Sequence, residues 1–201
     1  MRTSFVTLDI ETIKSNVNKL LPYLICAYNG TDFISSYGKM VNGIIDQKEL
    51  FSSFMLQLVT FFGKSNNLMV YAHNLSTFDG VFLLKHLLPF GKVKPLIHNG
   101  KIISISLTLS IKGYKGKTII FKDSYLLLPH SLRKLCKTFN ISFSKGYFPF
   151  LLNDIFYKGT FPTINYWIGL TAGEHLSISK QFINKVWSFQ DEATKYCIHL
   201  R

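Results

Sequence analysis

Hydrophobic residues in this chain gather in short runs separated by turn-forming residues, a pattern typical of strands. The runs that predict strands are Phe5–Asp9, Leu20–Tyr28, Asp32–Tyr37, Leu68–Ala72, Ile102–Ile111 and Thr118–Lys122. The Asn29-Gly30 pair between the second and third runs is a turn signal, so we expect these two strands to form a hairpin.

A second pattern, with apolar residues three or four positions apart, predicts helices. The expected helices are Asp46–Phe62, Asp79–Leu88, Ser131–Phe139 and Ser177–His199. Asp46 can cap the first helix, and residues 145–170, rich in Gly, Pro and aromatic residues, are expected to be irregular. This order of elements favours an α/β fold with a mixed central sheet flanked by helices. We find no repeat and no break in composition, so residues 1–201 are expected to form one domain.

The composition of the chain indicates what kind of partner the protein binds. The chain has 201 residues and a formal net charge of +12, which attracts polyanions. Nucleic acid is the favoured partner, ahead of an anionic membrane surface or a lysine-rich surface with no partner. No apolar run reaches the length of a membrane span, and the N-terminus resembles neither a signal peptide nor a transit peptide. The three cysteines form no Cys-x-x-Cys pair, which argues against a disulfide scaffold and a cysteine-based zinc site.

The first candidate site is the acidic end of the first predicted strand, Leu8-Asp9-Ile10-Glu11-Thr12. Alternation along a strand places Asp9 and Glu11 on one face. Two carboxylates this close repel each other unless a cation neutralises them, so the pair is a candidate site for Mg²⁺ or Mn²⁺. Taken alone, such a pair is more often a solvated acidic strand end.

The second candidate site is the segment from Tyr71 to Gly80, which follows a buried strand and opens a helix. Loops at the carboxyl ends of strands are where α/β proteins bind ligands. Asp79 could simply cap the helix, and His73 alone could be a packed loop histidine. The combination is more specific: Asp-x-Glu ends the first strand, and Asn-x-x-x-Phe-Asp follows a later one.

This combination resembles the 3′–5′ exonuclease domain of family B DNA polymerases, a branch of the ribonuclease H-like exonucleases that use four acidic residues. Asp9 and Glu11 match the first exonuclease motif, and Asn74, Phe78 and Asp79 match the second. The resemblance covers nearly the whole chain and implies a ribonuclease H-like fold with the site at the carboxyl edge of the first strand.

The segment from Phe121 to Leu135 is similar to the protein-primed subgroup found in phages, adenoviruses and mitochondrial linear plasmids. A Ser-Leu pair of that subgroup contacts single-stranded DNA; Ser124 matches the Ser, and Tyr125 stands where the Leu belongs. The subgroup also has a Lys-Gly segment whose lysine supports catalysis, which Lys145 matches best and Lys158 second best. A terminal protein primer is an implied partner of a full-length relative.

The resemblance implies two-metal hydrolysis of single-stranded DNA from its 3′ end. Asp9 would bridge two Mg²⁺ or Mn²⁺ ions, Glu11 and Asp79 would each hold one, and Lys145 would counter phosphate charge. The residues implied to contact the terminal nucleotides are Thr12, Asn74 and Phe78, with Tyr71, His73 and Phe82 as weaker candidates.

The third exonuclease motif departs from the family pattern, which is Tyr-x-x-x-Asp on the last helix. Tyr196 matches the Tyr, but Leu200 stands where the Asp belongs. Tyr and Asp four residues apart share one helix face, so Leu200 removes the fourth carboxylate, and Asp191 and Glu192 lie too far back to replace it. We expect a reading frame broken inside this motif. A fragment or a metal-poor relative would also account for Leu200, and the polymerase half is missing in each case.

Together these features favour a monomeric exonuclease domain of a protein-primed DNA polymerase, impaired in activity and encoded by a mitochondrial element. The excess of Lys over Arg fits the AT-rich genome of such an element. The alternative from another class is a non-catalytic single-strand binder. A ribonuclease or repair exonuclease is disfavoured by the Asn-x-x-x-Phe-Asp-Gly and Lys-Gly segments, and an untranslated relic stays open. Only the exonuclease hypothesis predicts a metal-dependent activity that Asp9→Ala abolishes.

Overall fold

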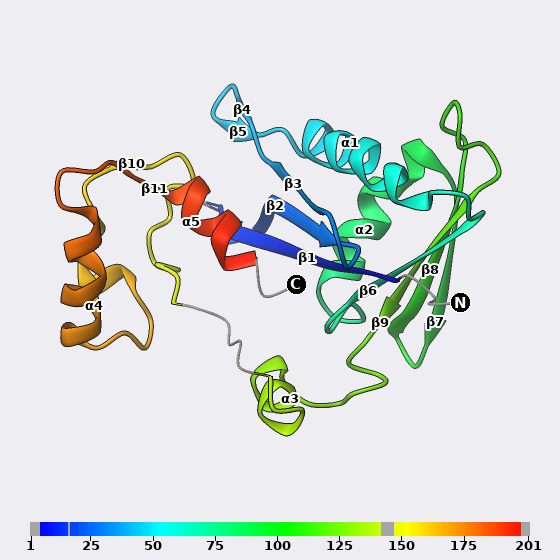
Figure 1. The fold of residues 1–201 in the computed structure, drawn as a ribbon. Helices are drawn as coiled ribbons and strands as arrows, with labels where there is room; N and C mark the ends of the chain where they lie inside the picture. The colour runs from blue at the N-terminus through cyan, green and yellow to red at the C-terminus, as the bar shows by residue number, and fades with distance from the viewer. Residues whose placement is uncertain (1–4, 16, 142–146, 198–201) are drawn as a thin grey trace.

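A computed structural model describes residues 5–15, 17–141 and 147–197 (Figure 1). Its centre is a seven-stranded sheet of order β3-β2-β1-β6-β9-β8-β7. The strands are β1 (Phe5–Lys14), β2 (Leu20–Tyr28), β3 (Phe33–Tyr37), β6 (Asn67–Ala72), β7 (Gly91–His98), β8 (Lys101–Leu109) and β9 (Thr118–Asp123). β6 is parallel to both β1 and β9, and the other neighbours are antiparallel. The expected mixed α/β sheet is therefore confirmed.

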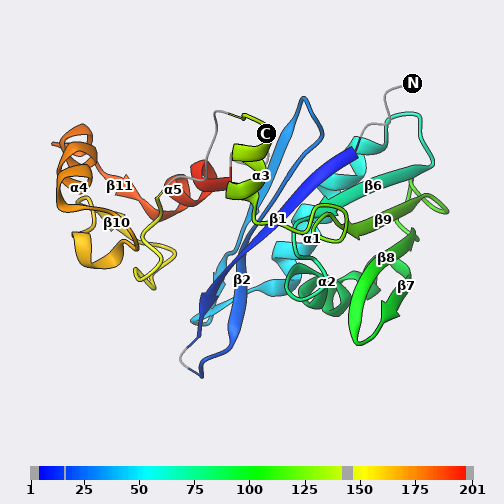
Figure 2. The same cartoon turned by 90° about the horizontal axis from the view of Figure 1, so that it is seen from below.

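The described residues form five helices, and those near the sheet lie on both of its sides. They are α1 (Gln47–Leu58), α2 (Asp79–Leu87), α3 (Leu132–Thr138), α4 (Ala172–Ser179) and α5 (Phe189–Tyr196), with 3₁₀ turns at Val59–Phe62, Leu88–Phe90, Ile164–Tyr166 and Lys180–Phe182. Figure 2 shows α3 and α5 on the side of β1 and β2 that lies opposite α1 and α2. Two short strand pairs complete the fold, β4 (Met40–Val41) with β5 (Ile44–Ile45) and β10 (Lys158–Gly159) with β11 (Trp187–Ser188). Within the described ranges, no helix is long and apolar enough to cross a membrane.

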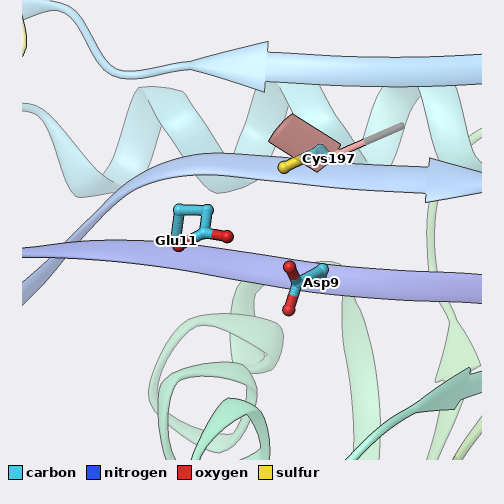
Figure 3. A group of neighbouring side chains, drawn as sticks. All are labelled: Asp9, Glu11 and Cys197. Atoms are coloured by element: carbon cyan, nitrogen blue, oxygen red, sulfur yellow. The ribbon is translucent and has the colours of Figure 1, made fainter. Parts of the chain in front are cut away.

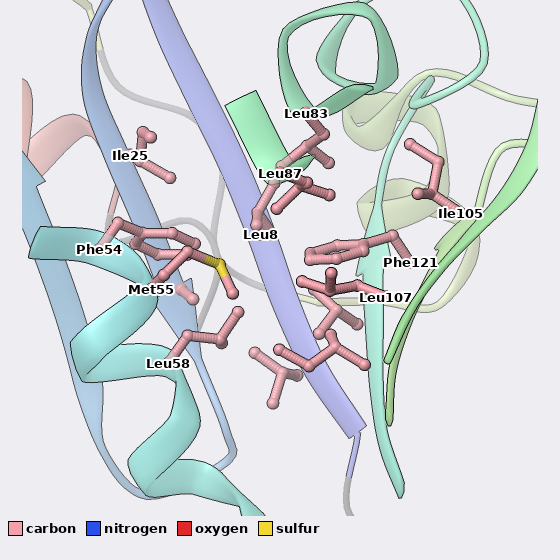
Figure 4. Packing of buried hydrophobic residues seen from close by; sticks show 14 of the residues in the cluster. Leu8, Ile25, Phe54, Met55, Leu58, Leu83, Leu87, Ile105, Leu107 and Phe121 are labelled. Carbon is pink, nitrogen blue, oxygen red and sulfur yellow. The ribbon is translucent and has the colours of Figure 1, made fainter. Parts of the chain in front are cut away.

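Alternation along β2 divides the hydrophobic core into two clusters. Ile25 and Ala27 belong to the larger cluster, which α1 and α2 pack against the central sheet (Figure 4). Leu24 and Cys26, on the other face of the same strand, join the second cluster, to which α5 contributes Phe189. The period of two along a strand thus places α5 on the face opposite α1.

Most predicted elements are confirmed with small changes at their ends. Asp46 caps α1, since its carboxylate accepts a hydrogen bond from the Glu49 amide at 3.0 Å. β2 and β3 form the expected hairpin. β1 continues past its predicted end at Asp9 to Lys14, because β2 pairs with it over that whole length. β7 was not predicted; it is an edge strand that is mostly exposed, so it lacks a hydrophobic pattern.

The predicted long helix over Ser177–His199 is wrong. After α4 the chain makes a 3₁₀ turn, adopts a left-handed conformation at Asn184 (φ 60°) and pairs through β11 with β10 before α5 begins. The side chain of Trp187 is only 1% exposed and lies in the second core cluster. Burying this large ring in an extended segment overrides the helical spacing of the sequence.

The carboxylate of Asp123, at the end of β9, joins the loops that follow β6 and β9. Its Oδ1 accepts hydrogen bonds from the amides of Asn74 at 3.0 Å and Tyr125 at 2.8 Å. Its Oδ2 accepts from the amide of Ser76 at 2.8 Å and from the Ser76 hydroxyl. Asp123 is only 3% exposed, so these bonds replace the water that a carboxylate needs when it is buried.

The larger core cluster yields a stability prediction. Phe54 of α1 is fully buried, whereas Leu56 on the same helix is 61% exposed. Phe54→Ala is expected to lower the free energy of unfolding by about 3–5 kcal/mol, because it leaves a cavity in the core. Leu56→Ala is the matched control and should change it by less than about 0.5 kcal/mol. Urea titration followed by circular dichroism measures both, and equal effects would contradict the described packing of α1.

The Asp123 carboxylate yields a second prediction. Asp123→Asn keeps the size of the side chain but removes the charge and replaces one acceptor by a donor, facing the amide and hydroxyl of Ser76. The free energy of unfolding should fall by about 2–4 kcal/mol. Asp32→Asn, in the exposed turn between β2 and β3, is the control with the same change of charge. If urea titration finds the two variants equally stable, the role assigned to Asp123 is wrong.

Candidate functional site

Asp9 and Glu11 lie on the face of β1 opposite the larger core cluster. Val6, Leu8 and Ile10, which alternate with them, are buried in that cluster. One ligand atom each of Asp9, Glu11 and Cys197 lie within 4.8 Å of one another, as Figure 3 illustrates. The structure therefore brings together the two carboxylates that the sequence placed on one face and adds a thiol that the sequence did not suggest.

Asp79 reaches the same part of β1 from the start of α2. Its Oδ1 accepts a hydrogen bond from the amide of Ile10 at 3.1 Å. The pairing of β1 with β6 ends at Leu8 and Ala72, so this carboxylate takes the place of a strand partner for β1. Asp79 is 2% exposed.

Gly80 explains how the start of α2 comes so close to the loop before it. The amide of Gly80 donates a hydrogen bond to the carbonyl of Leu75 at 2.9 Å. A Cβ atom at this position would lie 2.7 Å from that carbonyl oxygen. A residue with a side chain would therefore push the first turn of α2, and Asp79 with it, away from β1.

The electrostatics of these acids favour a cation. Burial raises the pKa of Asp79 well above its usual range, and the negative charges of Asp9 and Glu11 raise it further. The hydrogen bonds from the amides of Ile10 and Asp79 itself oppose that shift only in part. Carboxylates that repel one another in a buried site are stabilised by a bound proton or a bound cation.

Two further titratable groups border the same acids. A hydrogen bond with Cys26 and burial raise the pKa of the Cys197 thiol, and the charges of Asp9 and Glu11 add to that effect. Burial raises the pKa of the Tyr23 hydroxyl, with the charge of Glu11 as the next largest cause. Both groups are therefore protonated beside the carboxylates at neutral pH.

His73 is held by hydrogen bonds at both ring nitrogens. Nε2 lies 3.0 Å from the carbonyl oxygen of His130, and Nδ1 lies 3.1 Å from Oγ of Ser124. Because a carbonyl oxygen only accepts, Nε2 carries the proton, and in the neutral ring Nδ1 accepts from the Ser124 hydroxyl. The ring of Tyr125 meets His73 edge-on at 5.4 Å between centroids. These predicted DNA contacts thus form one cluster.

Two cavities lie along β1 on either side of the acids. The first, of about 500 Å³, contains Asp9, His73 and Ser124 and is bordered by apolar side chains that include Phe5, Leu127 and Leu128. The second, also of about 500 Å³, contains Glu11 and Thr12 and is bordered by aromatic side chains that include Tyr23, Phe148 and Phe150. A ligand that lay along this face of β1 would cross the carboxylates and meet apolar surface on both sides.

The other predicted residues lie outside the linings of these two cavities. Asn74 has a left-handed backbone (φ 72°), and its side-chain oxygen accepts a hydrogen bond from the Thr77 hydroxyl at 2.7 Å. Phe78 contacts Phe82 edge-on, with ring centroids 5.5 Å apart. Tyr196 packs its ring against that of Phe148, at 5.2 Å between centroids. Asn74 thus shapes its own loop, and both aromatic rings are engaged with neighbours.

Two positions of the sequence prediction, Lys145 and Leu200, lie outside the described residues. Lys158, the alternative to Lys145, is exposed in β10, where it pairs with Ser188 of β11. The residues that sequence reasoning missed are Cys26, Asp123 and Cys197. Alternation along β2 could have placed Cys26 next to Asp9, since the two residues are partners in the β1–β2 register. No local pattern marks Cys197, because its position depends on where α5 begins.

Comparisons with known proteins agree with this architecture. The chain is 30% identical to a probable DNA polymerase of Neurospora intermedia, over 96% of this chain and 22% of that protein. It is also 30% identical to a probable DNA polymerase of Ascobolus immersus, over 96% of this chain and 16% of that protein. The chain therefore spans about a fifth of the length of these relatives.

Solved structures of Phi29 DNA polymerase share the fold. The orthorhombic crystal form matches over 88% of this chain and 28% of that chain, with a TM-score of 0.55 at 18% identity. The complex with single-stranded DNA matches over the same shares, with a TM-score of 0.53 at 20% identity. This likeness confirms the predicted ribonuclease H-like fold class.

A family model described as DNA polymerase type B, organellar and viral, matches residues 60–199. That range holds α2 with Asp79, the loop that Asp123 anchors, and α5. The match spans more than half of the chain and agrees with both fungal relatives. The chain belongs to the type B DNA polymerases of organelles and viruses.

Proposed function

We propose that this chain supplies the 3′–5′ exonuclease activity of a protein-primed type B DNA polymerase and hydrolyses single-stranded DNA from its 3′ end. The observation that carries the proposal is the pair of carboxylates Asp9 and Glu11 on β1, with Asp79 near enough for their charges to raise its pKa, in a protein of this family. Carboxylates gathered between two cavities along a strand suit a phosphodiester that lies across them.

The acids fit the divalent ions that this chemistry uses. Their oxygens are the hard donors that Mg²⁺ and Mn²⁺ prefer, and the negative neighbours that raise the pKa of Asp79 also attract cations. Asp9, Glu11 and Asp79 would hold the ions, which when bound supply an activated water and stabilise the leaving 3′ oxygen. The hydrogen bond from the Ile10 amide keeps the Asp79 carboxylate oriented toward β1.

The cavities suit a single strand with its bases unpaired. Apolar and aromatic side chains around Asp9 and Glu11 offer surfaces on which bases can stack. Ser124 and His73 add polar groups beside Asp9. The net charge of +12 attracts a polyanion to the chain as a whole. One Phi29 polymerase structure of this fold is a complex with single-stranded DNA.

We further propose that the activity is weak, because Leu200 replaces the acid of the third motif. Tyr196, Lys145 and the DNA contacts at Thr12, Asn74, Phe78 and Tyr125 would act as the family resemblance implies. A monomer working in a mitochondrion, with a terminal protein as partner of the complete polymerase, fits the organellar and viral family. The second candidate function, favoured by the same substitution, is a single-strand binder that no longer cuts.

The exonuclease proposal predicts the effect of removing one acid. Asp9→Asn should lower the Mn²⁺-dependent degradation of a 5′-labelled single strand by about three orders of magnitude, because several kcal/mol of transition-state stabilisation are lost. Gel analysis of the shortened products measures the rate. Asp32→Asn, which makes the same change in an exposed turn, should degrade DNA at the unaltered rate. If Asp9→Asn keeps full metal-dependent activity, Asp9 is not part of the active site.

The third motif yields a separate prediction. Leu200→Asp should raise the rate of 3′-end degradation by about two orders of magnitude, since a fourth carboxylate would complete the ligand set. Leu200→Asn, which has nearly the same size but no charge, is the matched control and should stay slow. The single-strand binder predicts instead that neither variant degrades DNA, while both bind it with the same dependence on salt.

A further inference from the structure

We propose that Cys197 joins Asp9 and Glu11 in a mixed thiolate and carboxylate site for a thiophilic divalent ion of the Zn²⁺ or Cd²⁺ class. The inference shares two carboxylates with the proposed function but needs no nuclease activity. It starts from the convergence of three side chains, two on β1 and one at the end of α5 (Figure 3).

The spacing of the ligand atoms suits a single ion. One oxygen of each carboxylate and the Sγ of Cys197 all lie within 4.8 Å of one another. Ligands that surround one Zn²⁺ tetrahedrally, with bonds of about 2.0–2.3 Å, lie about 3.5 Å apart. Side-chain rotations that move each atom by about 1 Å would therefore close the set around an ion.

The fold fixes the thiol in this position. Cys197 is the C-cap residue of α5, and its amide donates hydrogen bonds to the carbonyls of Ala193 and Lys195. Cys26, which faces Asp9 in the β1–β2 register, makes a hydrogen bond with the Cys197 thiol. Both cysteines are fully buried. The Cys197 sulfur thus lies within the group of possible ligands, and Cys26 contacts it.

A site that contains a thiolate prefers a different class of ion than a site made of carboxylates alone. Oxygen ligands suit Mg²⁺ and Mn²⁺, whereas a thiolate favours Zn²⁺ and other soft ions. On binding, the thiol proton of Cys197 passes to solvent and an S–metal bond forms, with no change of oxidation state. Because Asp9 and Glu11 belong to both sets, the thiophilic ion and the hard ion compete for the same carboxylates.

Co²⁺ tests the site directly, because it replaces Zn²⁺ and gives a thiolate-to-cobalt charge-transfer band in the near ultraviolet. The full chain, reduced and checked for free thiols under denaturing conditions, is titrated with Co²⁺ and then with Zn²⁺. We expect the band to appear in the unaltered chain and to disappear when Zn²⁺ displaces Co²⁺. Absence of the band would overturn the proposal.

Substitutions of single cysteines identify which thiol binds Co²⁺ and gives rise to the band. Cys197→Ser should abolish it and weaken Zn²⁺ binding, measured by calorimetry, by about tenfold or more; Cys197→Ala serves the same purpose if the Ser variant fails to fold. Cys136→Ser, at the cysteine of α3 that is not fully buried, is the matched control and should keep the band. A band that survives both changes at Cys197 also overturns the proposal.

The measurement separates this inference from the proposed function, because it uses no DNA. If the chain shows the Cys197-dependent band but does not degrade DNA, the mixed metal site is supported and the exonuclease proposal is contradicted. If the chain degrades DNA with Mn²⁺ but shows no band, the exonuclease proposal is supported and the mixed metal site is contradicted. Where both hold, added Zn²⁺ should slow the Mn²⁺-dependent degradation, and Cys197→Ser should reduce that inhibition.

Discussion

The hydrogen bond from the Ile10 amide to the Asp79 carboxylate holds the candidate site together. It fixes the first residue of α2 against β1 at the point where β6 has ended and β1 has no strand on that side. Asp79 is thereby kept close enough to Asp9 and Glu11 for their charges to raise its pKa. The repulsion among these carboxylates favours a bound cation, since a cation relieves it and a neutral ligand does not.

The two faces of β1 have different roles. Its buried face, with Leu8 and Ile10, is packed against the helices of the larger core cluster and supplies rigidity. Its other face presents Asp9 and Glu11 between two cavities. The strand shifts register against β2 between Glu11 and Thr12. The extra residue at this irregularity is Tyr23 of β2, since Glu11 pairs with Leu24 and Thr12 with Pro22. Such a bulge bends the strand that carries it without ending the pairing.

Sequence patterns predicted the parts of this site that depend on local periodicity. Alternation placed Asp9 and Glu11 on one face, and the buried run before His73 marked the strand that leads to Asp79. The patterns failed where burial of a single large side chain decides the backbone. Trp187 keeps its segment extended, so α5 begins as a separate helix after β11 rather than continuing from α4. The position of Cys197, and with it the thiol beside the acids, could not be read from helical spacing.

The site also joins parts of the chain that are distant in sequence. The bond between Ile10 and Asp79 spans 69 residues, and the bond between Asn74 and Asp123 spans 49. Contacts of this range bring distant segments together and so exist only in the folded chain. An ion bound by Asp9, Asp79 or Cys197 therefore binds the folded chain in preference to the unfolded one. Occupancy of the centre would shift the folding equilibrium of the entire sheet, so that ion concentration acts on stability as well as on chemistry.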